Sequence, residues 1–483
     1  MRSVQDAIAH LSKLQLENVR IVSVSYEHTG AFGNASDLPP FYRVIFEVSF
    51  EEGTLSRTEL WLPDKWNGIF VGLGNGGMAG TISHEELAGY LVKDYAVAQT
   101  DMGTSRGRDS GIGRAGIWKD FGWRSTHMMT TVSKKLLISH YGQSARYAYF
   151  IGDSTGGQQA FSEAQRFPED YDGIIAGVPA NNRVFLHTYF LWNHNHLRTP
   201  DGQNCFTDDE IRTITVAAAA FFQDLGDGEP GDSFVSYPYR DADTVEKFID
   251  YLHRRFPAFS LQQLQALSAV YQGPVNPRTG KQIYNGMPIG SEIYSCGIHD
   301  CQQEESPYFY PFIWAFGEHY NGYDFDFDRD LEELSNMLSP DLNANDADLT
   351  AFKACGGKLL AFSGSADPCV PYPDALRYVE RVFDSMGGYD ATASFFRYFI
   401  VPGRDHGSGG WGANCLWGST PEQIDLLDTL RLWREKGEAP DHLLAARLEQ
   451  GTIRFARNIY PYGSVENPKK ESPKTCDSDY LNR

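Results

Sequence analysis

The chain has 483 residues, of which 41% are hydrophobic and 22% charged, a composition typical of a soluble globular protein. The 63 acidic residues outnumber the 42 basic ones, and the formal net charge of −21 would repel a phosphate backbone or an anionic membrane. We therefore expect a small-molecule substrate, and neither a nucleic acid nor a membrane as partner. The composition leaves the oligomeric state open.

The N-terminal stretch MRSVQDAIAHLSKLQLENVRIV lacks the continuous apolar segment of a signal peptide, and no apolar run is long enough to span a bilayer. The seven cysteines are scattered without a Cys-x-x-Cys pair, which argues against a zinc site. These features predict a cytoplasmic protein in a reducing compartment. A chain trimmed of its leader would have the same sequence features.

In the N-terminal part of the chain, strand patterns alternate with helix patterns. Apolar runs predict strands at Phe41–Phe50, Arg57–Pro63, Asn67–Gly72, Tyr95–Gln99, Ala145–Ile151 and Gly173–Val178. Helical spacing predicts helices at Glu85–Lys93, Trp123–His140 and Gln158–Arg166. Short buried strands that alternate with helices predict an α/β fold, with a mostly parallel, doubly wound sheet covered by helices on both faces.

The alternation stops near residue 181 and resumes after residue 342. Strands are then predicted at Lys358–Ser363 and Ser394–Val401, and helices at Asp374–Phe383 and Pro421–Lys436. Thr420 as N-cap, Pro421, Gln423 as its capping-box partner and Gly437 as the stop define the last helix. We interpret residues 1–180 and 343–483 as one catalytic domain and residues 181–342 as an inserted lid domain.

Ser154 lies in the sequence Gly152-Asp153-Ser154-Thr155-Gly156, between a predicted strand and a predicted helix. A serine in such a sharp turn presents its Oγ above the sheet, where it can act as a nucleophile. In a chain with 47 glycines the Gly-x-Ser-x-Gly spacing also arises by chance, so an ordinary turn serine is the alternative. Partner residues decide between the two.

A nucleophilic serine needs a histidine base that is oriented by a carboxylate, and in elbow-type hydrolases these follow in the order Ser, acid, His. Asp367 follows one predicted strand and His406 follows the last one, so both lie at carboxyl ends of strands, where catalytic groups gather. Asp405 competes with Asp367 for the role of the acid. His127, in a predicted helix, is interpreted as a packed or capping histidine.

The oxyanion of an ester-cleavage intermediate needs two N–H donors. One is expected to be the backbone N–H of Thr155, directly after the nucleophile, and the other that of Gly76 or Gly77 in the loop GLGNGGMAG. As a dinucleotide or phosphate loop this segment is incomplete, because no Gly-Lys-Ser or Gly-Lys-Thr follows.

With these motifs in place, the chain resembles the tannase and feruloyl esterase family of serine esterases, which have the α/β-hydrolase fold. The resemblance covers nearly the whole chain and rests on GNGGMAG, AQTDMG, DSTGGQQAFSEAQRFPEDYDGIIAGVPA, LQALSAVYQGPVNPRTGKQIYNGMPIGSE, GGKLLAFSGSADPCVP and VPGRDHGSGG. It implies that Ser154, Asp367 and His406 are the catalytic triad. It also implies that the insertion is a lid that contributes the substrate pocket.

Two positions at the active site, one on each side of the family's disulfide, depart from the family pattern. In the family a disulfide joins the positions before the nucleophile and after the histidine, and here these are Asp153 and Gly407. A carboxylate at 153 could replace the bridge by accepting an N–H bond from Gly407 or Ser408, or by pairing with Arg404. The alternative is that Asp153 faces solvent or caps a local turn.

The third departure concerns the calcium loop that the family carries in its lid. The segment QDLGDGEPGDSF offers Asp224, Asp227 and Asp232, but the third carboxylate is displaced by one residue from the family spacing. An acidic solvated turn is an equal alternative. We therefore assign no metal ligand and name no cofactor, and the sequence leaves open whether the loop around Asp224 and Asp227 binds calcium.

Aromatic residues make up 13% of the chain, and two dense clusters, FLHTYFLWNHNHL and SPYFYPFIWAFGEHYNGYDFDFD, lie in the insertion. Most aromatics pack in cores, but a lid that folds such clusters over a serine would form a flat apolar pocket suited to a phenolic ring. We therefore expect a carboxylic ester hydrolase for hydroxycinnamoyl or galloyl esters. The alternatives are an esterase for another aromatic or polyketide-type ester, and a catalytically weakened binding or scaffold protein.

Overall fold

The protein is described from a computed structural model that covers residues 2–105, 107–199, 201–239, 243–304, 307–419 and 425–467. The chain divides into two compact units, each with its own core. The first unit comprises Met1–Asn181, Phe316–Glu318 and Asp341–Leu360, and the second comprises Asn182–Ala315, His319–Pro340 and Ala361–Arg483. The chain leaves the first unit after Asn181 and re-enters it at Asp341, close to the predicted limits of the insertion. The interpretation of that insertion as a lid stays a prediction.

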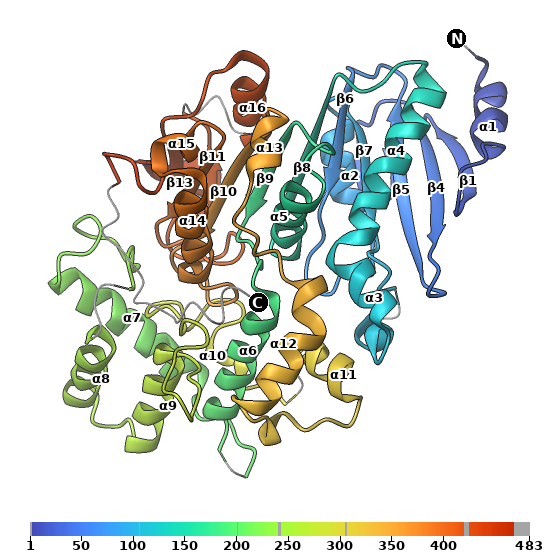
Figure 1. The fold of residues 1–483 in the computed structure, drawn as a ribbon. Coiled ribbons are helices and arrows are strands. Elements are labelled where there is room, and N and C mark those ends of the chain that lie inside the picture. The colour runs from blue at the N-terminus through green and yellow to red at the C-terminus, as the bar shows by residue number, and fades with distance from the viewer. Residues whose placement is uncertain are drawn as a thin grey trace. The chain divides into compact units, whose positions relative to one another are not determined.

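The first unit is built on a twisted sheet (Figure 1), in which the strands lie side by side in the order β1, β4, β5, β7, β6, β8, β9. Their bounds are β1 Val19–Glu27, β4 Phe41–Ser49, β5 Leu55–Pro63, β6 Ile69–Leu73, β7 Ala96–Thr100, β8 Tyr147–Asp153 and β9 Gly173–Gly177. The pairs from β1 to β7 are antiparallel, and β7, β6, β8 and β9 pair in parallel. A short hairpin, β2 Ala31–Phe32 with β3 Ala35–Ser36, stands apart.

Helices cover both faces of this sheet, which confirms the predicted α/β class. The helices of this unit are α1 Val4–Ser12, α2 His84–Leu91, α3 Ala115–Lys119, α4 Ser125–Tyr141, α5 Thr155–Arg166 and α13 Thr350–Ala354. In Figure 1, α4 lies in front of the strands and α2 behind them. The central strands β6 and β7 are buried along their whole length, as expected for strands covered on both faces.

The second unit contains the end of β10 (Lys358–Gly364), with β11 (Phe396–Val401) as its neighbour, and helices α14 (Tyr372–Met386) and α15 (Tyr389–Ala393). A separate antiparallel sheet consists of β12 Cys415–Trp417, β13 Leu443–Glu449 and β14 Thr452–Ile459. The insertion is helical, with α6 Arg183–Leu197, α7 Asp208–Asp224, α8 Thr244–Arg255, α9 Leu261–Gln272, α10 Ile298–Cys301, α11 Tyr310–Phe316 and α12 Arg329–Leu342. Most aromatics of α6 are buried, as a core would require.

The last predicted helix begins later than its sequence indicates. The described helix α16 spans Leu426–Arg431 and continues as a π-helical turn over Leu432–Lys436. The Asp425 side chain caps its start by accepting the Leu427 N–H at 2.8 Å. The predicted capping residues Thr420, Pro421 and Gln423 lie outside the described residues. The stop at Gly437 is confirmed, because Gly437 has a left-handed backbone with φ of 76°.

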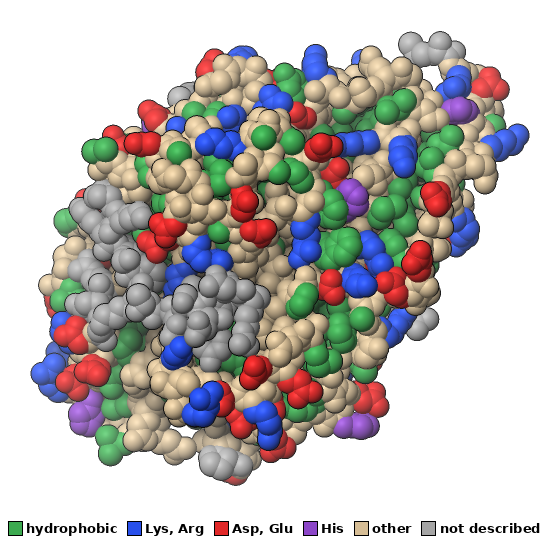
Figure 2. All heavy atoms as spheres, in the orientation of Figure 1, with side chains coloured by type: hydrophobic (Ala, Val, Ile, Leu, Met, Phe, Trp, Pro, Cys, Tyr) green, Lys and Arg blue, Asp and Glu red, His purple; other side chains and the backbone are tan. Residues whose placement is uncertain are grey.

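Figure 2 shows Lys and Arg side chains interspersed with Asp and Glu on the face in view. Across the described part of the chain, no helix is long and apolar enough to cross a bilayer.

Candidate active site

Ser154 occupies a strained elbow between β8 and α5. Its backbone has φ of 62° and ψ of −114°, a conformation that side-chain-bearing residues rarely adopt and that costs on the order of 1–3 kcal/mol. Backbone hydrogen bonds hold it there: the Ser154 N–H donates to Gly177 O at 2.9 Å, and Ser154 O accepts from Gln158 and Ala180, both at 3.1 Å. The predicted strand, turn and helix are therefore confirmed around this serine.

Glycines allow the elbow to form. A Cβ at Gly152 would lie 2.4 Å from Gly156 O, and one at Gly157 would lie 2.5 Å from Gly177 O. Both distances are too short for any side chain, so strand, turn and helix can approach only with glycine at these positions. Gly157 lies outside the Gly-x-Ser-x-Gly pattern, and that pattern alone does not identify its role.

The glycine-rich loop after β6 is tied to the N-terminus of α5. The Thr155 hydroxyl donates to Gly77 O at 2.6 Å, and the Gly156 N–H donates to Asn75 O at 2.7 Å. The structure thus brings together the two segments that carry the predicted oxyanion donors, Thr155 on one side and Gly76 with Gly77 on the other. Gly77 has φ of 55°, which glycine adopts without strain.

Two buried amides fix this loop, and sequence analysis did not identify them. Gln159 Oε1 accepts the Asn75 N–H at 2.8 Å, and Asn75 Nδ2 donates to Thr100 O at 2.8 Å. Gln159 is fully buried and Asn75 is 6% exposed, so both bonds are shielded from water. Their partners are distant in sequence, and no local pattern signals them.

Asp367 and His406 are hydrogen-bonded to each other in the second unit. His406 Nδ1 lies 2.8 Å from Asp367 Oδ2. The other carboxylate oxygen, Oδ1, accepts the N–H groups of Cys369 at 2.8 Å and Val370 at 2.9 Å, and Asp367 is fully buried. These bonds fix the orientation of the carboxylate toward the imidazole.

Asp405, the competitor for the acid role, has a different partner. Its Oδ1 accepts the Gly407 N–H at 3.0 Å, which closes a turn around His406. Of the two candidate acids, Asp367 is the one for which a bond to the imidazole is present. The catalytic roles of Ser154, Asp367 and His406 stay a proposal.

The Gly407 N–H donates to Asp405, although the sequence analysis gave Asp153 as a possible acceptor for it. Asp153 itself is exposed at the end of β8. Burial raises the pKa of Glu86 on α2, and the negative charge of Asp153 raises it further, so these two carboxylates lie near each other. A supporting role of Asp153 through Ser408 or Arg404 stays a prediction.

The cysteines of the described residues are all free thiols. They are Cys205, Cys296, Cys301, Cys355, Cys369 and Cys415. If no disulfide holds the site, ester hydrolysis by the native protein should be unchanged after incubation with a strong phosphine reductant. Comparing initial rates with and without reductant checks this expectation, and a loss of rate would contradict it.

Aromatic side chains of the insertion contact the loops that carry Asp367 and His406. Tyr189 on α6 donates its hydroxyl to Pro368 O at 2.7 Å, and the Tyr294 hydroxyl accepts the Trp411 N–H at 3.0 Å. Both contacts lie within the second unit. The insertion thus supplies side chains that hydrogen-bond to the turn after Asp367 and to the loop after His406.

The acidic loop of the insertion is stabilised by donors of the protein itself. Asp227 accepts the N–H groups of Ser236 at 2.6 Å and Tyr237 at 3.1 Å, and Asp232 forms a double hydrogen bond with Arg457 at 2.5 and 2.7 Å. Asp224 is the last residue of α7. A guanidinium therefore faces Asp232, the carboxylate whose spacing departs from the family.

Replacing Arg457 with methionine should lower the free energy of unfolding by about 1–2 kcal/mol, because Asp232 would lose both charge-assisted bonds. The Arg457 side chain is 24% exposed, so solvent screening keeps the effect below that of a fully buried pair. Urea unfolding of the wild type and Arg457→Met checks the value. Arg454→Met, which removes an exposed ion pair with Glu449, is the control and should change stability little.

The sequence profile described as "Tannase and feruloyl esterase" matches residues 54–305 and 318–482. The chain belongs to this family. Its members are serine carboxylesterases, which confirms the predicted enzyme class.

Individual relatives agree with the family assignment. An uncharacterized esterase of Xanthomonas campestris is 30% identical, with 92% of this chain and 85% of the relative covered. Feruloyl esterase B of Aspergillus niger is 28% identical, with 93% and 90% covered. A crystal structure of an esterase from Aspergillus oryzae superposes with a TM-score of 0.84 at 23% identity and covers 96% of this chain and 99% of that one, which confirms the α/β-hydrolase fold.

Proposed function

We propose that this esterase hydrolyses esters of phenolic aromatic acids through an acyl-enzyme intermediate on Ser154. The observation that carries the proposal is the 2.8 Å bond between His406 and the buried Asp367, together with the strained elbow at Ser154. A serine, a histidine and an aspartate in these settings are the components of nucleophilic ester cleavage. The named feruloyl esterases among the relatives support the substrate class.

In the proposed reaction His406 acts first as base and then as acid. With its Nδ1–H donated to Asp367, the Nε2 of His406 is the nitrogen that takes the Ser154 proton as Oγ attacks the ester carbonyl. The alcohol leaves with that proton, and a water molecule activated by the same nitrogen then releases the phenolic acid. Asp367 stabilises the imidazolium that forms in each half-reaction.

The oxyanion of each tetrahedral intermediate would be bound by the N–H of Thr155 and that of Gly76 or Gly77. Removing one donor of such a pair lowers kcat by roughly 100- to 1000-fold. The hydrogen bond from Thr155 to Gly77 O keeps the loop close to the start of α5. This preorganisation would spare the enzyme a rearrangement at the moment of reaction.

The aromatic insertion supports the preference for a phenolic acyl group. Tyr189 and Tyr294 contact the loops of the acid and the base, and the Tyr308 ring stacks on Phe190 with centroids 4.3 Å apart. Flat rings and hydroxyl edges suit a phenolic ring better than a short aliphatic chain. We expect selectivity for the acid part of the ester to depend on this region, which we propose is a lid.

Two measurements test the proposal. A serine-directed phosphonate should add its mass once, to the peptide that contains Ser154, and the binding or scaffold alternative predicts no adduct. A screen of methyl ferulate, chlorogenate, methyl gallate and a short aliphatic ester should then give the highest kcat/KM for a phenolic ester. A preference for the aliphatic ester would contradict the substrate class while leaving the adduct, and hence the mechanism, intact.

We further propose that the protein works in a reducing, cytoplasmic compartment. The free thiols of the described residues and the absence of cysteines at 153 and 407 support this location. Fractionation of the native host with an antibody against the protein tests it. Recovery from the culture medium would contradict it.

A further inference from the structure

Glu163 on α5 is a buried carboxyl group outside the proposed catalytic machinery. It is 1% exposed, and within the described part of the chain no N–H or O–H group donates a hydrogen bond to either of its carboxylate oxygens. A buried carboxylate without a partner is costly, because it loses its hydration and gains nothing in return. Such a group needs a proton or a cation.

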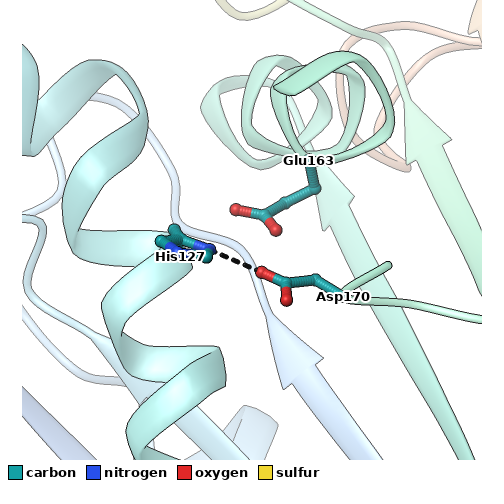
Figure 3. Close-up of side chains that lie close together, drawn as sticks. All are labelled: His127, Glu163 and Asp170. Atoms are coloured by element: carbon teal, nitrogen blue, oxygen red, sulfur yellow. Dashed lines mark hydrogen bonds and ion pairs between the residues drawn. The ribbon is translucent and has the colours of Figure 1, made fainter. Parts of the chain in front are cut away.

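Two further side chains that could bind a cation border the same space. His127 on α4 and Asp170, in the loop after α5, are joined by a 2.7 Å contact between Nδ1 and Oδ2. Ligand atoms of His127, Glu163 and Asp170 all lie within 4.8 Å of one another. Figure 3 shows the Glu163 carboxylate pointing from α5 toward the space that the other two side chains border.

We propose that His127, Glu163 and Asp170 bind one divalent cation of the zinc or manganese class. One imidazole and two carboxylates suit such borderline cations, and the two negative charges balance the charge of the ion. The His127 side chain is 28% exposed, so an ion and a completing water molecule have access from solvent. These residues are distinct from the acidic loop of the insertion.

Neighbouring groups hold two of the ligands in place. The His127 ring stacks on Phe167 with centroids 3.8 Å apart, and the Lys134 ammonium donates to the backbone carbonyl of Asp170. Supports of this kind orient metal ligands.

The cation would connect α4, α5 and the loop after α5. Because α5 begins directly after Ser154, the site would stabilise the helix that holds the elbow. The ion would therefore act on stability and take no part in ester cleavage.

The test uses the full chain after removal of bound metal with a chelator. Zinc and manganese are titrated by calorimetry, and the metal content after desalting is measured by mass spectrometry. We expect about one ion per chain and a Tm that rises with the free metal concentration, because binding to the native state shifts the folding equilibrium.

Matched variants locate the ion. Glu163→Gln and His127→Gln should each weaken binding by at least about tenfold and remove the response of Tm to the metal, since each removes a ligand. Glu169→Gln, at an exposed position in the same loop as Asp170, should behave as the wild type.

Either of two results would overturn the proposal. One is wild-type protein that binds neither metal, in which case Glu163 and Asp170 share a proton instead and Glu163→Gln should unfold at the same or a higher temperature. The other is undiminished binding by His127→Gln and Glu163→Gln, which would place the ion elsewhere. Circular dichroism of each variant at low temperature verifies that it is folded.

Discussion

Ser154→Ala is expected to lower kcat for a phenolic ester by about three to six orders of magnitude, because no other group can form the acyl-enzyme. KM should change little, since the hydroxyl contributes to the transition state more than to binding. Stopped assays with a fluorescent or chromogenic ester over several hours measure the residual rate. Retention of more than a few per cent of the wild-type activity would show that Ser154 is not the nucleophile.

The two candidate acids provide a matched comparison. Asp367→Asn should lower kcat by roughly three to four orders of magnitude, because the amide favours the wrong imidazole tautomer. Asp405→Asn keeps an oxygen that can accept the Gly407 N–H and should lower kcat far less. Equal losses in the two variants would contradict the assignment of Asp367, even if Ser154 proved essential.

The elbow could be predicted from sequence because its determinants are local. A buried strand, small residues and a helical pattern occur in succession around Ser154, and each is visible in a window of a few residues. The sites for Asp367 and His406 follow from the rule that catalytic groups gather where parallel strands end. The hydrogen bond between them could not be predicted from the sequence, because the choice between Asp367 and Asp405 depends on which of the two carboxylates points toward the imidazole of His406.

The burial of polar residues in helix α5 could not be predicted from the sequence. Its polar residues Gln158, Gln159, Ser162 and Glu163 would be placed on a solvent-facing side by their polarity, yet all four are buried. Gln159 bonds to Asn75 in a distant loop, and Glu163 lies near His127 on α4, so only the tertiary structure reveals the surroundings of these polar side chains. For the same reason the sequence predicted neither the hydrogen bond from the Asn75 N–H to Gln159 nor the grouping of Glu163 with His127 and Asp170.

The other unpredicted features involve boundaries and long-range contacts. Helix α16 starts at Leu426, where Asp425 caps it. The sequence instead predicted a capping box at Thr420, which lies outside the described residues. Tyr189 and Tyr294 contact the Asp367 and His406 loops across long stretches of sequence. Residue composition indicated an aromatic insertion but could not assign any single ring to the site.

Two adjacent glutamines allow the catalytic effect of the hydrogen bond between Gln159 and the Asn75 N–H to be separated from its effect on stability. Gln159 accepts the Asn75 N–H and so holds the loop of Gly76 and Gly77, whereas Gln158 donates to Gly122 O at 2.8 Å, away from that loop. Both side chains are fully buried. Replacing either with leucine should lower the free energy of unfolding by about 1–3 kcal/mol, because each leaves a buried backbone group without its partner.

Only Gln159→Leu should also impair catalysis. If the loop shifts when the Asn75 N–H loses its acceptor, an oxyanion donor moves out of line and kcat should fall by roughly 100-fold with little change in KM. Gln158→Leu should retain kcat within about threefold, since its lost bond is remote from the proposed donors. Steady-state kinetics well below each Tm, together with urea unfolding, separates the two effects. Equal kcat in the two variants would mean that Gln159 has only a structural role and that the position of the glycine loop does not depend on it.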